Sequence, residues 1–191
     1  MTHLSTLVAA ALLAVGPAAF AQSSPYAGEQ HRAVKALDAR EVTALKQGQG
    51  MGFAKAAELN GYPGPMHTLE LAEPLRLTPE QRTATRQLMD AHKARSRELG
   101  EAVVQAEAAL DSLFAGRQAT PERVSQATQH IATLQAQLRA EHLNTHLAQT
   151  ALMSPAQAKR YAELRGYDGA APAPAPALQD LPSQQGHGHR H

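Results

Sequence analysis

The sequence predicts an all-α protein: a long antiparallel helical hairpin, shorter flanking helices and a disordered C-terminal tail rich in alanine and proline. Ala, Gln, Leu and Glu dominate the chain, and these residue types favour helices. Thr-Pro and Ser-Pro pairs, which open helices, begin at Thr78, Thr120 and Ser154. After the first two pairs, apolar or small side chains recur every three or four residues along two long stretches, as in amphipathic helices.

Residues 1–21 have the pattern of a secretory signal peptide. The apolar run LVAAALLAVGPAAFA is short for a membrane span and ends in the small-x-small sequence Ala19-Phe20-Ala21, which predicts cleavage before Gln22. The alternative is an uncleaved anchor helix, which would need about 20 apolar residues. We therefore expect export to the periplasm. An exported chain without cysteine has no disulfide, no catalytic thiolate and no Cys-based zinc site.

Residues 22–66 are expected to form short helices and turns. Asp38, with Glu41 three residues later, is typical of a capping box, and the helix that it opens should end at the glycines of GQGMG (48–52). A second short helix is predicted within 53–59, before an Asn-Gly pair and a YPGP turn. The next helix is predicted from His67 to about Leu75.

The hairpin is predicted from two long helices, from Pro79 to about Phe114 and from Pro121 to about Leu152. At 1.5 Å per residue they would be about 54 and 48 Å long. The intervening AGRQAT is long enough only for a tight reversal, so facing residue numbers should sum to about 235. The helices present two stripes, Leu88, His92, Arg95, Leu99, Val103, Ala106, Leu110 and Leu113 on the first and Val124, Ile131, Leu134, Leu138, Thr145 and Ala148 on the second.

Two similar words begin the first hairpin helix and a last helix predicted at 155–164. In LTPEQ, Thr78 suits the N-cap position, Pro79 the first helical position and Gln81 the third, from which its side chain can reach the Thr78 amide. MSPAQ repeats the pattern with Ser154 as the cap and Gln157 at the third position. The hairpin geometry would bring both words to the same open end.

An exported, cysteine-free helical chain with two such words resembles the Spy/CpxP family of periplasmic proteins, named after its LTxxQ motif. The first word matches the motif through Leu77, Thr78 and Gln81; the second matches through Gln157, with Met153 for Leu and Ser154 for Thr. The domain of this type is expected over residues 67–167. The preceding region is similar to that of the heavy-metal sensor and resistance branch, which includes CnrX-like proteins.

The resemblance implies a hairpin that often dimerises, with one of several functions. Spy-like members bind partly unfolded envelope proteins on an amphipathic surface without ATP, and CpxP-like members also damp an envelope sensor kinase. We therefore expect a periplasmic chaperone or envelope-stress protein that forms a homodimer. The alternative is a periplasmic metal sensor or resistance protein, as CnrX-like members are. A third possibility is that the protein is a structural interaction partner of an envelope sensor and has neither chaperone nor metal-binding activity. Fold alone does not choose among these.

Histidines motivate the metal alternative. His142 and His146 lie four residues apart on one helix face, and His67 and Glu70 lie three apart on the preceding short helix. Together they would suit zinc, copper, nickel or cobalt. By the same sum, His92 would face residue 143 and is therefore a possible fifth neighbour of these four side chains. The alternative is that this spacing arises by chance among ten histidines. The tail histidines would bind metals weakly and without selectivity: His187, His189 and His191.

Other functional classes find little support. The net charge is +1, with no basic stripe of the kind that nucleic acid requires. There is no nucleophile elbow, phosphate-binding loop or His-Glu-x-x-His sequence, so an enzyme is not expected and no cofactor is required. Glu98 and Glu101 are expected to be solvated surface carboxylates rather than an acid/base pair.

Overall fold

The computed structural model describes residues 24–167, which contain helices and no strand. This confirms the predicted all-α class. In chain order the elements are η1 (Glu29–His31), α1 (Ala39–Gln47), α2 (Lys55–Glu58), α3 (Pro65–Glu70), α4 (Pro79–Ala115), α5 (Pro121–Ala151) and α6 (Pro155–Leu164). The predicted signal peptide and tail lie outside the described residues. Within residues 24–167, none of the helices combines the length and the hydropathy that a membrane crossing requires.

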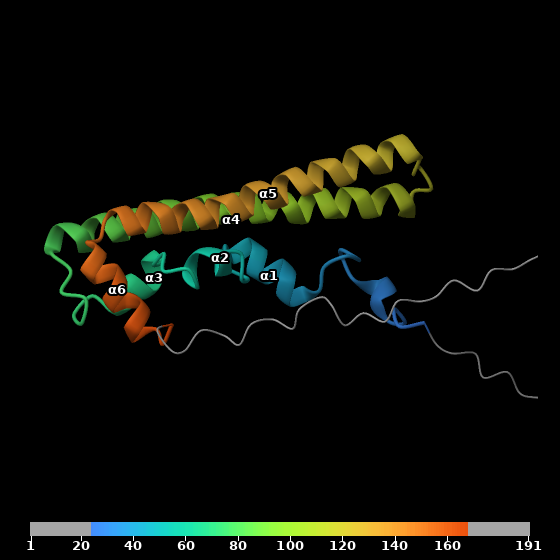
Figure 1. Cartoon of the computed structure of the whole chain (residues 1–191). Coiled ribbons are helices and arrows are strands. Elements are labelled where there is room, and N and C mark those ends of the chain that lie inside the picture. Colours follow the sequence, from blue (N-terminus) through green and yellow to red (C-terminus); the bar gives the residue numbers. More distant parts are fainter. Residues whose placement is uncertain (1–23, 168–191) are drawn as a thin grey trace, which may run out of the picture. The chain divides into compact units, whose positions relative to one another are not determined.

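The single 3-10 turn η1 belongs to a unit separate from the helical body. In it, the Glu29 N–H donates to the Tyr26 carbonyl at 3.0 Å. The body begins at Arg32, and in it α4 and α5 run antiparallel side by side, as predicted, while α1, α2 and α3 follow one another along the hairpin (Figure 1). The chain reverses between α4 and α5 at Arg117, which has a left-handed backbone (φ 52°).

Helix starts follow local capping chemistry. The predicted capping boxes are present at Thr78 with Gln81 and at Ser154 with Gln157: each cap oxygen accepts from the third helical N–H, and each Gln side chain accepts from the cap N–H. Thr120 caps α5 with its side chain. These contacts span three residues, which explains why the starts of α4, α5 and α6 match the sequence prediction.

The short helices differ from their predicted bounds. Helix α3 begins at Pro65, which suits a first helical turn, and ends at Glu70 rather than near Leu75. Pro74 lacks an N–H and disfavours a helical residue before it, so the chain continues to Arg76 as turns. Helix α2 is a single turn of four residues.

One close approach sets the position of α1 on α4. A Cβ atom added at Gly100 would lie far inside the van der Waals distance of the Leu45 carbonyl oxygen, so the two backbones touch. Gly100 is buried in the middle of α4, where glycine costs about 1 kcal/mol relative to alanine. The crossing places the end of α1, and therefore the loop 48–52, over α4.

The stripe prediction for the hairpin is partly wrong. Leu99, Val103 and Leu138 are buried as predicted, but Arg95 and Ala148 are exposed. For Arg95 the reason is that α1 as well as α5 packs against α4, so the buried face of α4 differs from a stripe that faces α5 alone. Thr145 is buried as predicted, and the half of the hairpin near its open end also buries polar side chains that the stripes did not include: Thr85, Ser96, His142 and Gln149.

Apolar packing is divided into two clusters. The first joins α1 to the middle of the hairpin and contains Val34, Leu45, Leu99, Val103, Val104 and Leu138. The second lies at the open end and contains Ala72, Leu75, Leu77, Met153 and Tyr161. Between them along α4 and α5 the interior is polar.

The two LTPEQ-like words lock the open end together. The Gln81 and Gln157 amides form a reciprocal pair, with N–H···O distances of 2.9 and 3.0 Å. Gln81 also donates to the Leu152 carbonyl at 2.8 Å, and Gln157 to the Leu75 carbonyl at 3.2 Å. The predicted proximity of the two words is therefore confirmed, and each glutamine both caps its own helix and fastens the opposite arm.

The first prediction concerns this lock. Gln157→Leu removes both bonds between the two amides and leaves the Leu75 carbonyl and the Ser154 N–H without their side-chain partners, so it should lower the free energy of unfolding by about 1–3 kcal/mol. The double variant Gln81→Leu/Gln157→Leu should cost less than the sum of the two single variants, because the shared pair is lost only once. Urea unfolding measures all three, with the exposed Gln126→Leu on α5 as the control. Strict additivity would contradict the lock.

Candidate functional site

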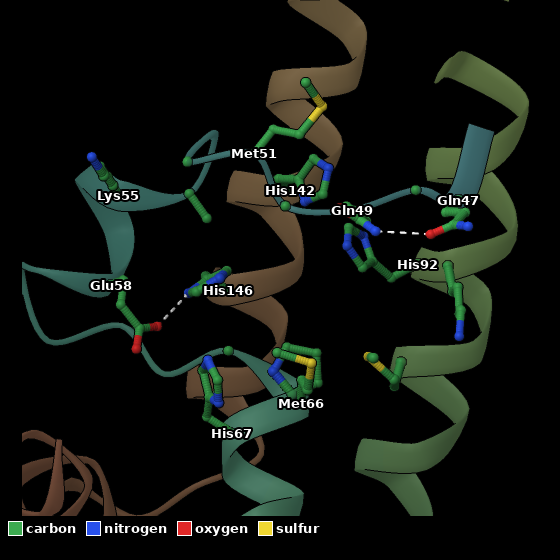
Figure 2. Close-up of a pocket in the computed structure, with 18 of the residues that line it drawn as sticks. Gln47, Gln49, Met51, Lys55, Glu58, Met66, His67, His92, His142 and His146 are labelled. Carbon is green, nitrogen blue, oxygen red and sulfur yellow. Dashed lines mark hydrogen bonds and ion pairs between the residues drawn. The ribbon is translucent and has the colours of Figure 1, made fainter. Parts of the chain in front are cut away.

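A cavity of about 680 Å³ opens between the hairpin, the loop after α1, and helices α2 and α3. Its hairpin wall comprises residues of α4 from Met89 to Arg97 together with His142 and His146 of α5, which lie between the two apolar clusters along each helix. Figure 2 shows His67, His92, His142 and His146 gathered around this cavity from three different helices.

His146 is held by the turn before α3. Its Nδ1 lies 2.7 Å from the Tyr62 carbonyl oxygen, and because a carbonyl only accepts, Nδ1 carries the proton. In the neutral ring the lone pair is then on Nε2. A Cβ atom at Gly64 would lie 2.9 Å from that Nε2, so only glycine leaves room for the ring. The YPGP turn thus positions an imidazole with its basic nitrogen defined.

His142 is the most deeply buried imidazole, with 4% of its surface exposed. Its Nε2 has no hydrogen-bond partner among residues 24–167. The ring packs edge-on against His92, with centroids 4.6 Å apart, and against Phe53 at 5.4 Å. Burial, reinforced by the charges that His92 and His146 carry when protonated, lowers the pKa of His142 to about 4. His142 is therefore neutral at physiological pH.

Carboxylates orient the other two imidazoles. His92 Nδ1 lies 3.2 Å from Glu141 Oε1 and 3.0 Å from Thr145 Oγ1, and His67 Nδ1 lies 2.8 Å from Glu70 Oε2. A carboxylate accepts hydrogen bonds, so Nδ1 carries the proton in both rings and Nε2 holds the lone pair when the ring is neutral.

Glu58 links the cavity to the last helix. One of its oxygens accepts from the Tyr161 hydroxyl at 2.6 Å and the Tyr167 hydroxyl at 2.9 Å, and lies 3.3 Å from Arg165 Nε. The other lies 3.6 Å from His146 Nδ1. Burial and the adjacent Glu58 carboxylate raise the pKa of Tyr161. The only carboxylate that lines the cavity in the described chain is therefore already occupied.

Sequence reasoning found part of this site. His67, His142 and His146 line the cavity together, as does the neighbour His92, whereas Glu70 stands behind His67 as its hydrogen-bond partner. In the part of the chain that the structure describes, no group of three or more His, Asp or Glu side chains is arranged to hold a metal ion. The predicted metal binding therefore stays a prediction, and it requires imidazoles to turn toward a common point.

Other lining residues escaped sequence analysis. Met51, Met66 and Met89 all line the cavity. A signal existed, because Met66 directly precedes His67, and Met89 lies three residues before His92 on α4. Glu58 had no such signal, because the turn after α2 is what brings it to His146.

The second prediction follows from the lowered pKa of His142. Between pH 6.5 and about 4 the unfolded chain binds a proton at His142 that the folded chain does not, so the free energy of unfolding falls as the pH falls. The full contribution is present above pH 6.5. His142→Phe should remove up to about 3 kcal/mol of this pH dependence. Chemical unfolding across the range measures it; the exposed His130→Gln should keep the wild-type slope. Parallel curves for His142→Phe and the wild type would contradict the assignment.

No protein-family model, curated protein or solved structure matches this chain. The Spy/CpxP resemblance stays a prediction that rests on its motif residues.

Proposed function

We propose that this chain is an exported protein that binds a transition-metal ion in the imidazole-lined cavity. One observation carries the proposal: four histidines from three helices line one cavity, and Nδ1 of three of them is anchored to an oxygen acceptor. In such an arrangement each neutral ring keeps its Nε2 lone pair for an ion.

The anchoring partners support this use of the rings. Metal-binding histidines commonly donate their second ring N–H to a carboxylate or a backbone carbonyl, which selects the tautomer and the orientation of the ring. Glu70, Glu141 and the Tyr62 carbonyl occupy that role here. His142 adds a buried nitrogen that has no partner within the described chain, and an unpartnered buried polar atom is costly unless something binds it.

An ion at this place would join α3 to both helices of the hairpin. His67 belongs to α3, His92 to α4, and His142 and His146 to α5. An ion bound only by the folded chain stabilises it, by about 2.7 kcal/mol at one hundred times the dissociation constant. Zinc, copper, nickel and cobalt all accept imidazole nitrogen, so the histidines alone do not select the metal.

The third prediction tests this proposal. The full chain with His187, His189 and His191 replaced by Ser, which removes weak tail binding, is titrated with zinc, nickel, cobalt and copper ions. We expect saturable one-to-one binding of at least one ion, weakened about tenfold or more in His142→Phe and in His146→Gln because each loses a ligand. His130→Gln is the control. Unchanged binding in both cavity variants, with their helical circular dichroism intact, would overturn the proposal.

A second candidate is the ATP-independent chaperone that the resemblance implies. The observation that favours it is a set of exposed apolar side chains on the body: Leu59, Tyr62, Met66 and Leu147. The Tyr62 carbonyl oxygen lies 2.7 Å from His146 Nδ1, and Leu147 follows His146 on α5. Exposed apolar side chains that gather on a surface are typical of interaction sites.

The fourth prediction concerns this surface. The chain should suppress aggregation of a reduced client protein without nucleotide, when present in equal to severalfold amounts. The variant Leu59→Ser/Tyr62→Ser/Leu147→Ser should lose at least half of the effect, because the contacts that it removes are apolar. Light scattering measures aggregation. Phe114→Ser, which removes an exposed apolar side chain at the hairpin turn, should retain the activity. Full aggregation of the client beside excess wild-type chain would argue against a chaperone.

A further inference from the structure

We propose that the cavity selects copper in its Cu(I) state, through imidazole nitrogen and methionine thioether sulfur acting together. The inference rests on the proposed metal binding and adds the oxidation state and the sulfur ligands. Thioethers are soft donors that favour Cu(I), whereas zinc, nickel and cobalt are less suited to them.

The methionine distribution supports sulfur ligands. The chain has five methionines and no cysteine, and three of the methionines line this one cavity. Met51 is 44% exposed and Met66 is 48% exposed. By contrast, Met153 is 9% exposed and belongs to the apolar cluster at the open end. Packing therefore explains Met153 but not Met51 or Met66. Figure 2 shows Met51 and Met66 near the histidines, on opposite sides of His142 and His146.

The backbone conformation of Met51 also supports a role for its side chain in the site. Its φ is 43°, in the left-handed region that favours glycine, and it lies between Gly50 and Gly52. A residue with a side chain is strained in this backbone conformation, whereas glycine would adopt it without strain. Strained residues concentrate at functional sites, and this strained position places a methionine side chain at the cavity.

Charge also favours a monovalent ion. The donors of this site are neutral imidazoles and thioethers, so a bound ion keeps its full charge. Lys55, Lys93 and Arg97 line the same cavity, and the carboxylate of Glu58 is occupied by two tyrosines and an arginine. A doubly charged ion would be repelled more strongly by these cations, and it would lack the anionic ligands that usually offset its charge.

Cu(I) also needs less rearrangement of the histidines than a larger set of ligands would. Cu(I) is satisfied by few donors, so only His92 and His142, whose ring centroids already lie 4.6 Å apart, would have to turn toward it. The Nε2 of His142 has no partner in the described part of the chain. A thioether from the flexible methionine side chains can complete the set without a third imidazole.

The fifth prediction tests Cu(I) selection on the same full chain with serine at the three tail histidine positions. Under anaerobic, reducing conditions we expect one Cu(I) per chain, held against a chromogenic Cu(I) chelator, and sulfur in its X-ray absorption spectrum. Because the chain lacks cysteine, that sulfur must come from methionine. Met51→Gly and Met66→Leu/Met89→Leu should weaken Cu(I) binding about tenfold or more and leave zinc binding unchanged. Met51→Gly relieves the left-handed strain, so its thermal unfolding should not move to lower temperature. Met153→Leu is the matched control.

The outcomes separate this inference from the proposed function. One outcome is that an ion binds and His142→Phe weakens it, while the methionine variants leave the affinity unchanged and the Cu(I) spectrum shows no sulfur. In that case Cu(I) selection is overturned and metal binding stands. Binding of no ion at all overturns both. Cu(I) selection would also be overturned if Met153→Leu weakened Cu(I) binding as much as Met51→Gly does. A general effect of methionine substitution on folding would then explain both losses.

Discussion

The contact between the backbone of Gly100 and the Leu45 carbonyl is the constraint on which the candidate site depends. It lets α1 lie directly on α4, so the chain leaves α1 as a glycine-rich loop above residues 89–97 of the hairpin. Any side chain at residue 100 would push α1 outward and move that loop with it. The apolar cluster around Leu99 and Val103 then holds the crossing in place.

The cavity lies where the hairpin is least apolar. Clusters at either side supply most of the packing, while the segment between them buries Thr85, His142 and Gln149 with polar atoms that have no partner in the described chain. Such groups cost stability unless water or a ligand satisfies them. Natural chains commonly depart from consistent packing at functional sites, and this segment departs from it in the same place where four imidazoles meet.

The Glu58 carboxylate gives the site a physical connection to α6. It is shared by Tyr161, Tyr167 and Arg165 on one side and lies beside His146 on the other. A ligand that draws His146 away would remove one neighbour of the carboxylate that holds the last described residues of the chain. The exposed apolar surface around Tyr62 begins at the same turn that anchors His146, so a cavity function and a surface function would share one structural element.

The helices could be predicted from the residues alone, because their start signals are local. The caps at Thr78, Thr120 and Ser154 act over three residues, so the bounds of α4, α5 and α6 and the antiparallel hairpin could be predicted. Of the four ligands predicted from the sequence, His67, His142 and His146 line the cavity, and Glu70 is the hydrogen-bond partner of His67. The packing of the helices was needed to show that Arg95 faces solvent and that the methionines and Glu58 join the site. These features depend on the crossing of α1 over α4, which is a contact between distant residues that no local pattern records. The end of α3 at Glu70 agrees with the effect of Pro74, which is a local signal that the predicted helix had passed over.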